Sequence, residues 1–294
     1  MKHKFILFLL IVLFVISTSL CGLGFYYDIK NNNENVNNNK NNDNKCDDKP
    51  KEVLECTFDG ELVQGAEYVN GQYTYRYMQE RGLFVKWINI NEDGWGVMLT
   101  DKNSTDPVTT KLCNTINGKP IVSMSYMFDD SNATEIDLSS FDTSNVVDMS
   151  GMFTDSSALE LDLSSFDTRS VTNMYDMFFD SRAIEIVGLN KFDTANVIDM
   201  SRMFANSSIT KLDLSSFDTS SVTSMNFMFS NTAIKELDLS NFNILDETYV
   251  DGMLNDVKSN IVYVRTKKDI DKLKEYAGSP SNLNFVVKQW FINF

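Results

Sequence analysis

The chain has 294 residues, of which 43% are hydrophobic and 23% are charged, a composition that fits a folded protein and excludes a wholly disordered one. Its formal net charge of -15 repels polyanions, so nucleic acid is not an expected partner. A partner that is steered by charge should instead be basic.

The first 27 residues are predicted to enter a membrane. Basic residues at positions 2–4 precede an apolar run over residues 5–27, and a helix of this length, roughly 23 residues, can span a bilayer. Three forms of anchoring or release are open: an uncleaved signal anchor, a signal peptide cleaved near residues 17–19, and a lipoprotein modified at Cys21. In each case the residues after Tyr27 are exported.

Residues 28–52 are rich in Asn and contain too few apolar side chains to offset the entropy lost on ordering. They are predicted to be a disordered linker between the membrane and the folded domain. The cysteines of the chain match no zinc or redox motif. Cys56 and Cys113 could form a disulfide in an oxidising compartment, or both could remain buried thiols, and Cys46 has no assigned partner.

Residues 53–120 contain short stretches in which apolar and polar residues alternate, such as Tyr73–Tyr77 and Phe84–Ile88. This alternation is typical of strands that bury one face. Asn-Gly pairs at 70–71 and 117–118, and the stretch Asn91–Gly94, favour hairpin turns. The segment is predicted to be a small β domain that also caps the N-terminal end of the domain beginning at residue 121.

Two phrases repeat in register between residues 121 and 254. The dipeptide Met-Phe recurs every 25 or 26 residues, at Met127, Met152, Met177, Met203 and Met228, and ends as Met253-Leu254. A phrase like Leu-Asp-Leu-Ser-Ser-Phe keeps the same spacing and begins at Ile136, Leu161, Val187, Leu212 and Leu237. Two interleaved motifs with one period indicate a solenoid in which each repeat stacks on the next.

Each repeat is predicted to contain one short strand and one helical turn. Leu161 and Leu163 alternate with Glu160 and Asp162, so the leucines should face inward and the acids outward. After this phrase, Asp-Thr should cap a turn, and Val and Met then come at spacings of three and four, as on one face of a helix. The predicted fold is therefore an α+β leucine-rich-repeat solenoid, with its 11 repeat methionines in the core.

Several phrases of the repeat region resemble a known family. Ile-Asn-Gly-Lys-Pro-Ile at residues 116–121, Met-Ser-Tyr-Met-Phe at 124–128 and the recurrent Leu-Asp-Leu-Ser-Ser-Phe-Asp-Thr are similar to the BspA-like leucine-rich-repeat surface proteins of bacteria. The resemblance extends from about Asp93 to the C-terminus. It implies a surface-exposed protein, with members acting as adhesins toward host matrix, host receptors or neighbouring bacteria, and it supplies no catalytic residues. The third repeat departs from the pattern, with Gly188 in place of the strand aspartate.

Residues 255–294 are predicted to close the array. Ile261–Val264 has the apolar pattern of a last strand, and Lys267–Tyr276 has that of a charged amphipathic helix. A polar cap is expected because the open end of a solenoid exposes its core and a strand edge. The aromatic tail, Trp290–Phe294, should pack on this cap, with a role in sorting or partner docking as the alternative.

The chain lacks the residues that most catalytic mechanisms need. Its only histidine, His3, precedes the membrane segment, so no Ser-His-Asp triad, Cys-His pair or His-ligated zinc is expected in the exported part. No glycine-rich phosphate-binding loop is found, and no cofactor or metal site is assigned. Carboxylates are plentiful enough for a glycosidase pair, but they recur once per repeat, as scaffold residues do. The sequence therefore predicts a non-catalytic protein.

Acidic residues form two columns along the array. Asp142, Asp167, Asp193 and Asp218, each with Thr as the next residue, are expected to cap turns through backbone hydrogen bonds, with calcium binding as the alternative. The second column should point outward from the strands and holds the candidate partner-binding residues Glu135, Asp137, Glu160, Asp162, Asp213, Glu236 and Asp238. Residues 123–260 contain 23 acidic and 7 basic side chains, a net charge of -16. In strands about 4.8 Å apart these carboxylates repel one another unless water, a cation or a basic partner relieves them.

The predicted function is binding at the cell surface, as an adhesin or a recognition module for an extracellular protein or another surface macromolecule. The alternative is a structural spacer or variable coat without a specific ligand, and a surface glycosidase is a remote third. An adhesin should show aromatic or arginine hot spots on the strand face. That face holds mostly Asp, Glu and Ser, with Ile186 and Lys211 as exceptions, which also suits a solvated acidic surface.

Overall fold

The computed structural model describes residues 54–79 and 93–288, all within one compact unit that begins at Pro50. Several predictions lie outside these residues: those for the membrane segment with Cys21, the linker with Cys46, the strand at 84–88 and the tail at 290–294. Within the described ranges, no helix is both long and apolar enough to cross a membrane.

The first described residues form a six-stranded sheet with the order β1-β5-β6-β4-β3-β2. Its strands are β1 (Glu55–Cys56), β2 (Glu67–Asn70), β3 (Tyr73–Met78), β4 (Gly94–Leu99), β5 (Thr115–Ile116) and β6 (Lys119–Ser123). β2 pairs antiparallel with β3, and β5 with β6, which confirms the hairpins predicted at residues 70–71 and 117–118. At their turns, Gly71, Asn117 and Gly118 have the positive φ values of 57°, 50° and 71° that such turns require.

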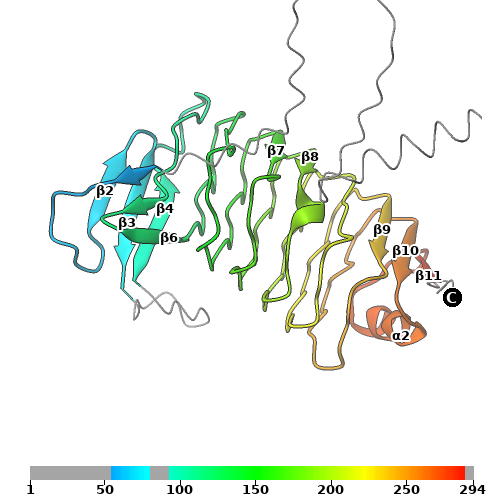
Figure 1. Cartoon of the computed structure of the whole chain (residues 1–294). Helices are drawn as coiled ribbons and strands as arrows, with labels where there is room; N and C mark the ends of the chain where they lie inside the picture. Colours follow the sequence, from blue (N-terminus) through cyan, green and yellow to red (C-terminus); the bar gives the residue numbers. More distant parts are fainter. Residues whose placement is uncertain (1–53, 80–92, 289–294) are drawn as a thin grey trace, which may run out of the picture. The chain divides into compact units, whose positions relative to one another are not determined.

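The sheet shares its core with the first repeat. The ring of Tyr73 lies 6.1 Å from that of Phe141, and the N–H of Leu99 donates to the carbonyl of Met127 at 3.0 Å. Val108 adds a parallel bridge to Ile136. Each repeat forms one coil of the solenoid, and the first coil has no coil before it. The sheet therefore covers this end of the solenoid, as the blue-to-cyan end of Figure 1 shows.

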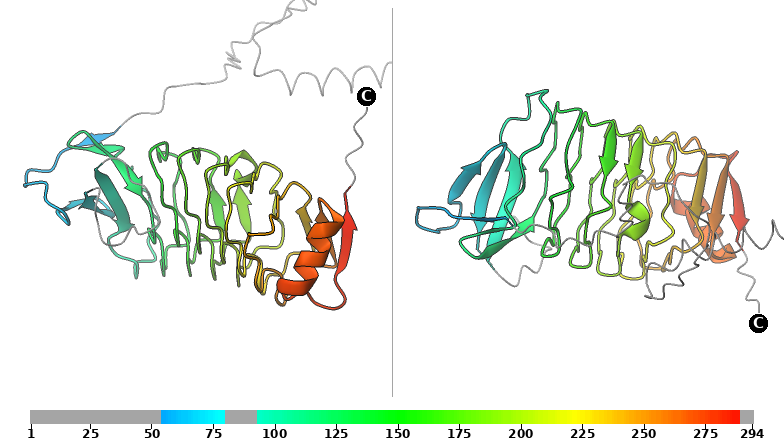
Figure 2. Two further views of the ribbon diagram at one scale, coloured as in Figure 1. Left: turned by 90° about the horizontal axis from the view of Figure 1, so that it is seen from below. Right: turned by 45° about the horizontal axis from the view of Figure 1, so that its top comes forward.

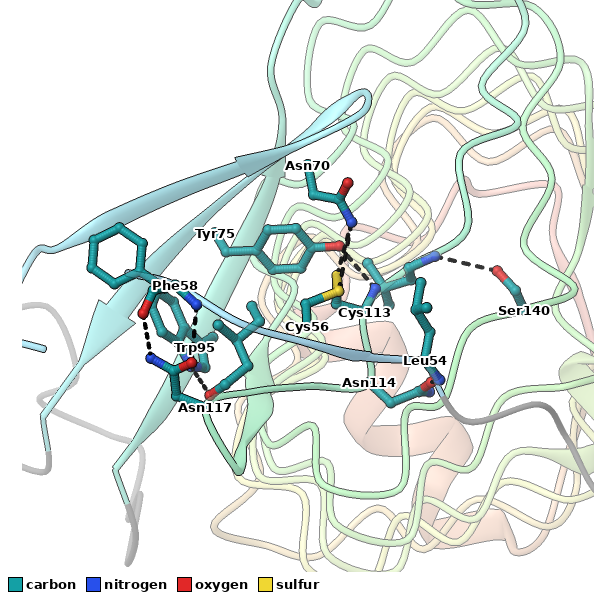
Figure 3. The surroundings of a disulfide bond; sticks show 12 residues. Leu54, Cys56, Phe58, Asn70, Tyr75, Trp95, Cys113, Asn114, Asn117 and Ser140 are labelled. Carbon is teal, nitrogen blue, oxygen red and sulfur yellow. Dashed lines mark hydrogen bonds between the residues drawn. A yellow bond between two sulfur atoms is a disulfide. The ribbon is translucent and has the colours of Figure 1, made fainter. Parts of the chain in front are cut away.

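A disulfide ties β1 to the segment before β5. Cys56 and Cys113 are 57 residues apart, and their Sγ atoms are bonded with the Cα atoms 5.9 Å apart (Figure 3). The N–H of Cys113 donates to the hydroxyl of Tyr75 at 2.9 Å. Of the two alternatives for these cysteines, the structure shows the disulfide.

Short parallel strands succeed one another along one side of the array (Figures 1 and 2). They are β7 (Glu160–Asp162) with β8 (Glu185–Val187), and β9 (Glu236–Leu239) with β10 (Ile261–Val264) and β11 (Asn284–Val287). The first coil contributes a single bridge at Ile136, and residues 211–214 form no named strand. The fold is a repeat solenoid built mostly of strands and turns.

The predicted alternation holds in the second coil. Leu161 and Leu163 are buried, whereas Glu160 and Asp162 are exposed. At the C-terminal end, β10 and the helix α2 (Lys267–Tyr276) form where they were predicted. The helix begins with a capping box, in which Thr266 and Asp269 bond to each other's backbone N–H groups.

The return leg of each coil is not the predicted helical turn. Each Met-Phe segment contains two residues with positive φ, which a right-handed helix excludes; in the first coil they are Tyr126 and Asp130, at 54° and 56°. Methionines three residues apart both face the core because a turn closes between them, with the N–H of Met177 donating to the carbonyl of Met174 at 3.3 Å. We call these segments the Met turns, residues 124–130 and their counterparts in later coils.

The Met turns are joined from coil to coil by backbone hydrogen bonds. The N–H of Phe178, for example, donates to the carbonyl of Met203 in the next coil at 2.9 Å. Parallel bridges run through this edge at Ser123, Asp148, Asn173, Asp199, Ser224 and Tyr249. A second ladder thus replaces the bonds that a helix would have made within each coil.

Two rows of stacked phenylalanine rings fill the interior. Phe178 is fully buried, with its ring centroid 5.6 Å from that of Phe153 and 5.5 Å from that of Phe204, in nearly parallel planes. In the second row, Phe217 lies 6.4 Å from Phe192. The repeat methionines are buried beside these rows, as predicted. Each coil therefore depends on its neighbours for its core.

Candidate binding surface on the strand face

Acidic residues of the predicted outward column lie along the strand side of the first two coils. Glu135, Asp137, Glu160 and Asp162 are exposed, and β7 and β8 set Glu160 directly beside Glu185 in parallel register. Like charges at this spacing disfavour each other. The surface therefore gains from any cation that comes to lie over it.

An open hollow of about 670 Å³ lies over the first three coils. It is lined by Thr134, Glu135, Ile136, Leu159, Glu160, Leu161, Asp162, Glu185 and Val187. Three apolar side chains stand exposed in and beside it, Leu159 at 48%, Ile184 at 56% and Val187 at 46%. The lining combines acidic and apolar groups and contains no basic side chain.

One carboxylate oxygen of each strand aspartate accepts a hydrogen bond from a nearby backbone N–H group. Oδ1 of Asp162 accepts the N–H of Ser164 at 2.9 Å, and Asp137 and Asp213 accept equivalent bonds two residues on. The hydroxyl and the N–H of the serine two residues on hold the pKa of each of these three carboxyls below its usual range. These groups stay ionised, and part of their role is to fix the turn after the strand.

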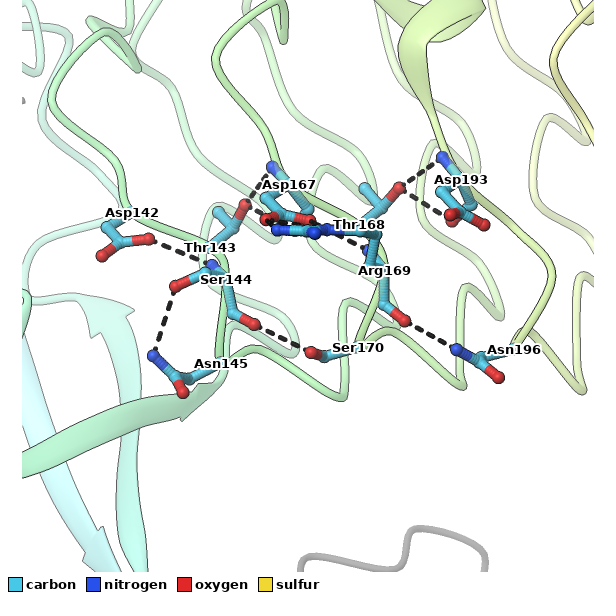
Figure 4. A network of polar contacts seen from close by, with 10 residues as sticks. All are labelled: Asp142, Thr143, Ser144, Asn145, Asp167, Thr168, Arg169, Ser170, Asp193 and Asn196. Atoms are coloured by element: carbon cyan, nitrogen blue, oxygen red, sulfur yellow. Dashed lines mark hydrogen bonds and ion pairs between the residues drawn. The ribbon is translucent and has the colours of Figure 1, made fainter.

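The Asp-Thr column has the predicted bonding and an additional one. Oδ1 of Asp193 accepts the N–H of Ala195 at 3.1 Å, which confirms the capping of a turn. The buried Thr168 joins two coils, because its Oγ1 donates to the carbonyl of Asp193 and accepts the N–H of the same residue, both at 2.9 Å (Figure 4). Thr143 bonds Asp167 in the same way, at 2.9 and 2.7 Å.

The outer column is interrupted at Val187, so the assignment of the interruption to Gly188 was wrong. β8 pairs Val187 with Asp162, which gives valine the place of the aspartate. Gly188 is the extra residue of the 26-residue repeat, and this insertion displaces the sequence motif by one position. Its φ is 95°, and a Cβ there would lie 2.5 Å from the backbone nitrogen of Ser164. A continuous acidic column would need Val187→Asp.

The one-residue shift of the motif also made the predicted direction of the Ile186 side chain wrong. It was predicted to face outward, but it pairs with Leu161 in the inward position and packs partly against the core. Glu185 was not singled out, although it continues the 25-residue spacing of Glu135 and Glu160. That spacing was the signal that could have found it.

The C-terminal half of the predicted site is partly neutralised by the chain itself. The ammonium of Lys288 lies 2.6 Å from Oδ2 of Asp238, and Lys211 stands where Glu160 stands in the second coil, two residues before the aspartate. Burial works to raise the pKa of Asp238, but hydrogen bonds from Lys288 and Ser240 outweigh it and leave the pKa lowered. The unpaired acidic surface is therefore concentrated over the first three coils.

In the part of the chain that the structure describes, no three His, Cys, Asp or Glu side chains come together so as to hold a metal ion. A family model described as "Mycoplasma protein of unknown function, DUF285" matches residues 103–187 and 179–274. No curated protein and no solved structure matches the chain.

Proposed function

The chain belongs to this family of mycoplasma proteins of unknown function, because the match covers more than half of its length. We propose that it is a non-catalytic binding protein exposed at the cell surface. The apolar run at residues 5–27 and the resemblance of the repeats to BspA-like leucine-rich-repeat surface proteins support an exported, membrane-anchored protein, with a lipoprotein or secreted form as variants of the same proposal. The Cys56–Cys113 disulfide supports an oxidising compartment.

The observation that carries the binding role is the hollow over the first three coils. Glu135, Glu160 and Glu185 supply unpaired negative charge, while Leu159 and Val187 supply exposed apolar surface. A basic protein segment that also bears apolar side chains would relieve the repulsion between the carboxylates and cover these groups. The proposed partner is therefore a basic extracellular protein, or another surface macromolecule that presents such a segment.

The test compares two variants with equal losses of charge. The full-length protein in detergent would be used to capture partners from matrix proteins and whole cells, and association rates would be measured at two ionic strengths. We expect Glu135→Gln, Glu160→Gln and Glu185→Gln together to slow association about tenfold at low salt, and less at high salt. Asp213→Asn, Glu236→Gln and Asp238→Asn together should bind like the parent. Equal rates for both variants would assign the capture to another surface.

A second candidate function, a spacer or coat without a specific ligand, is favoured by a different observation. The strand aspartates are bonded to their own turns, and the described strand face lacks the exposed aromatic residues that usually dominate binding energy. On that account the acids keep the array soluble. It predicts that no protein is captured at physiological salt from any of the sources above.

A further inference from the structure

The exposed aromatic residues of the repeats gather on the edge formed by the Met turns rather than on the strand face. Near the C-terminal end of this edge, Phe227 is 42% exposed and Tyr249 64%, and Tyr276, the last residue of α2, is 50% exposed. Exposed aromatic side chains can contribute strongly to a protein interface once a partner buries them. We call Phe227, Tyr249, Tyr276 and Asp251 the aromatic cluster.

Backbone pairing brings the members of the cluster together. The N–H of Phe227 donates to the carbonyl of Asp251 at 2.9 Å, and the N–H of Gly252 donates to the carbonyl of Tyr276 at 3.1 Å. The segment that contains Asp251 and Gly252 thus lies between Phe227 and Tyr276, and Tyr249 belongs to the same coil.

Gly252 leaves room for a flat ring at this place. Its φ is 62°, and a Cβ there would lie 2.2 Å from Cε1 of Phe227, so the ring of Phe227 rests on the bare backbone. Any side chain at this position would push the ring away. The glycine therefore holds one face of Phe227 against the protein and leaves the ring partly open to solvent.

The cluster lies in an acidic environment. Asp251 is exposed. The pKa of Tyr276 is raised, first by a hydrogen bond to Glu275 and by the charge of Glu275, and further by the charge of Asp251. Lys274, two residues before Tyr276, places its ammonium 5.9 Å from the ring of Phe285 instead. Exposed rings beside carboxylates favour a cation, because the negative ring faces and the carboxylate charge act together.

The same edge already holds one guanidinium in this way. Arg202 lies 4.0 Å above the ring centroid of Phe179, its Nε is 3.2 Å from Oδ1 of Asp176, and its Nη1 donates to the hydroxyl of Tyr175 at 2.9 Å. Two rings and a carboxylate of the third coil thus bind an arginine from the fourth. Phe227 occupies the position of Arg202 in the next Met turn, and both have positive φ. At the end of this edge an exposed ring therefore stands where the fourth coil carries a guanidinium.

We propose that the aromatic cluster is a docking point for an arginine side chain presented by a partner protein. The guanidinium would stack on the exposed rings and pair with the carboxylate of Asp251, as Arg202 does with Phe179 and Asp176. This surface is separate from the strand face and does not depend on the proposed role of that face.

The test uses a defined probe and the full-length protein in detergent at physiological salt. A fluorescent peptide with three arginines spaced by glycine and serine would be titrated by anisotropy, alongside the same peptide with citrulline, the neutral isostere of arginine. We expect the citrulline peptide to bind at least tenfold more weakly. The double variant Tyr249→Ala and Tyr276→Ala should weaken arginine binding about tenfold, and Asp251→Asn about threefold.

Two controls separate this site from the strand face and from structural damage. Tyr276→Phe keeps the ring and should bind like the parent. The variant with Glu135, Glu160 and Glu185 changed to Gln should stay within threefold of the parent, whatever that variant does to the partner of the strand face. Equal binding of arginine and citrulline peptides, or parent-like binding by both aromatic-cluster variants, would overturn the proposal. Selective binding of soluble phosphocholine, with no response to the arginine peptide, would overturn it in favour of a lipid headgroup.

Discussion

Gly188 has a backbone conformation and a close neighbour that together exclude a side chain. Its φ of 95° disfavours any residue with a Cβ, and the atom added there would lie 2.5 Å from the backbone nitrogen of Ser164. Gly65 provides a matched comparison, since its φ is 85° but nothing lies within 4 Å of its added Cβ.

We therefore expect Gly188→Ala to lower the free energy of unfolding by about 3 kcal/mol or more, because backbone strain and a backbone clash add. Gly65→Ala should cost only about 1 kcal/mol, from the positive φ alone. Urea denaturation monitored by circular dichroism measures both. Equal costs for the two variants would contradict the close packing of the third coil on the second.

Asp176 is a buried carboxyl whose ionisation works against the fold. Burial raises its pKa to about 6 despite the guanidinium of Arg202 at 3.2 Å. The folded protein therefore holds a proton on this group between pH 4 and 6 that the unfolded chain, with its ordinary pKa of 3.8, has lost. Stability contributed by this site is present at the lower pH and is lost as the pH rises through that window.

Asp176→Asn should remove this loss. The stability of the variant relative to the parent should rise steadily from pH 4 to pH 6.5 and then level off, as measured by urea midpoints at each pH. Asp180→Asn is a suitable control, because Asp180 has a similar φ of 52° but is exposed. A constant difference between Asp176→Asn and the parent would show that Asp176 does not titrate in this range.

At the scale of the coil, side chains continue the backbone ladders where the chain turns away from the strand. Thr168 is 2% exposed, and its single hydroxyl satisfies both the N–H and the carbonyl of Asp193 in the next coil. A buried backbone group that loses its partner costs about 1–3 kcal/mol. In the Asp-Thr phrase, the aspartate therefore caps a turn and the threonine links two coils.

Thr168→Val, which keeps the shape and removes the hydroxyl, should lower the free energy of unfolding by about 1–3 kcal/mol. Thr210→Val, at an exposed position in the fourth coil, should change it by less than about 0.5 kcal/mol. Thermal and urea unfolding would measure the difference. If both substitutions are silent, the threonine bonds contribute nothing to the cohesion of the stack.

The sequence predicts some elements well because a local pattern determines them. The inward Leu161, the β10 strand and the α2 helix all result from periodicity and capping within a few residues. The Met turns were misread because methionines three apart satisfy a helical face and a hydrogen-bonded turn equally. Only the inter-coil bonds, such as that of Phe178 to Met203, decide between them, and they depend on a neighbour 25 residues away.

The candidate site was predictable in its charge and not in its extent. The outward direction of Glu160 and Asp162 results from alternation in one strand. The one-residue insertion at Gly188 hid Glu185 and Val187, because a motif alignment cannot tell which residue is the extra one. The neutralisation of Asp238 depends on Lys288, 50 residues later, and no local sequence pattern predicts this pair.

At the scale of the whole molecule, the shared core predicts cooperative unfolding of the described residues. The ring of Tyr73 in the sheet contacts Phe141 in the first coil, and phenylalanine stacking then runs through the array past Phe178. A solenoid with nearest-neighbour contacts of this kind transmits a local loss of packing to the coils beside it.

Phe178→Ala should therefore cost about 3–5 kcal/mol by leaving a cavity between two rings. Its transitions by circular dichroism and by tryptophan fluorescence, to which the buried Trp95 of the sheet contributes, should shift together. Ile184→Ala, at an exposed position in the same region, should leave both midpoints near the parent values. Separate transitions for the two signals would mean that the sheet and the array unfold independently.

Carboxyl labelling would show whether the acidic hollow over the first three coils is the surface that meets a partner. The full-length protein, alone and bound to a captured partner, would be treated with carbodiimide and glycine ethyl ester, and labelled carboxylates located by mass spectrometry. We predict that the partner protects Glu135, Glu160 and Glu185, while Asp213 and Glu236 are labelled as in the free protein. Unchanged labelling of Glu135, Glu160 and Glu185, with protection elsewhere or nowhere, would mean that the partner binds outside the acidic hollow.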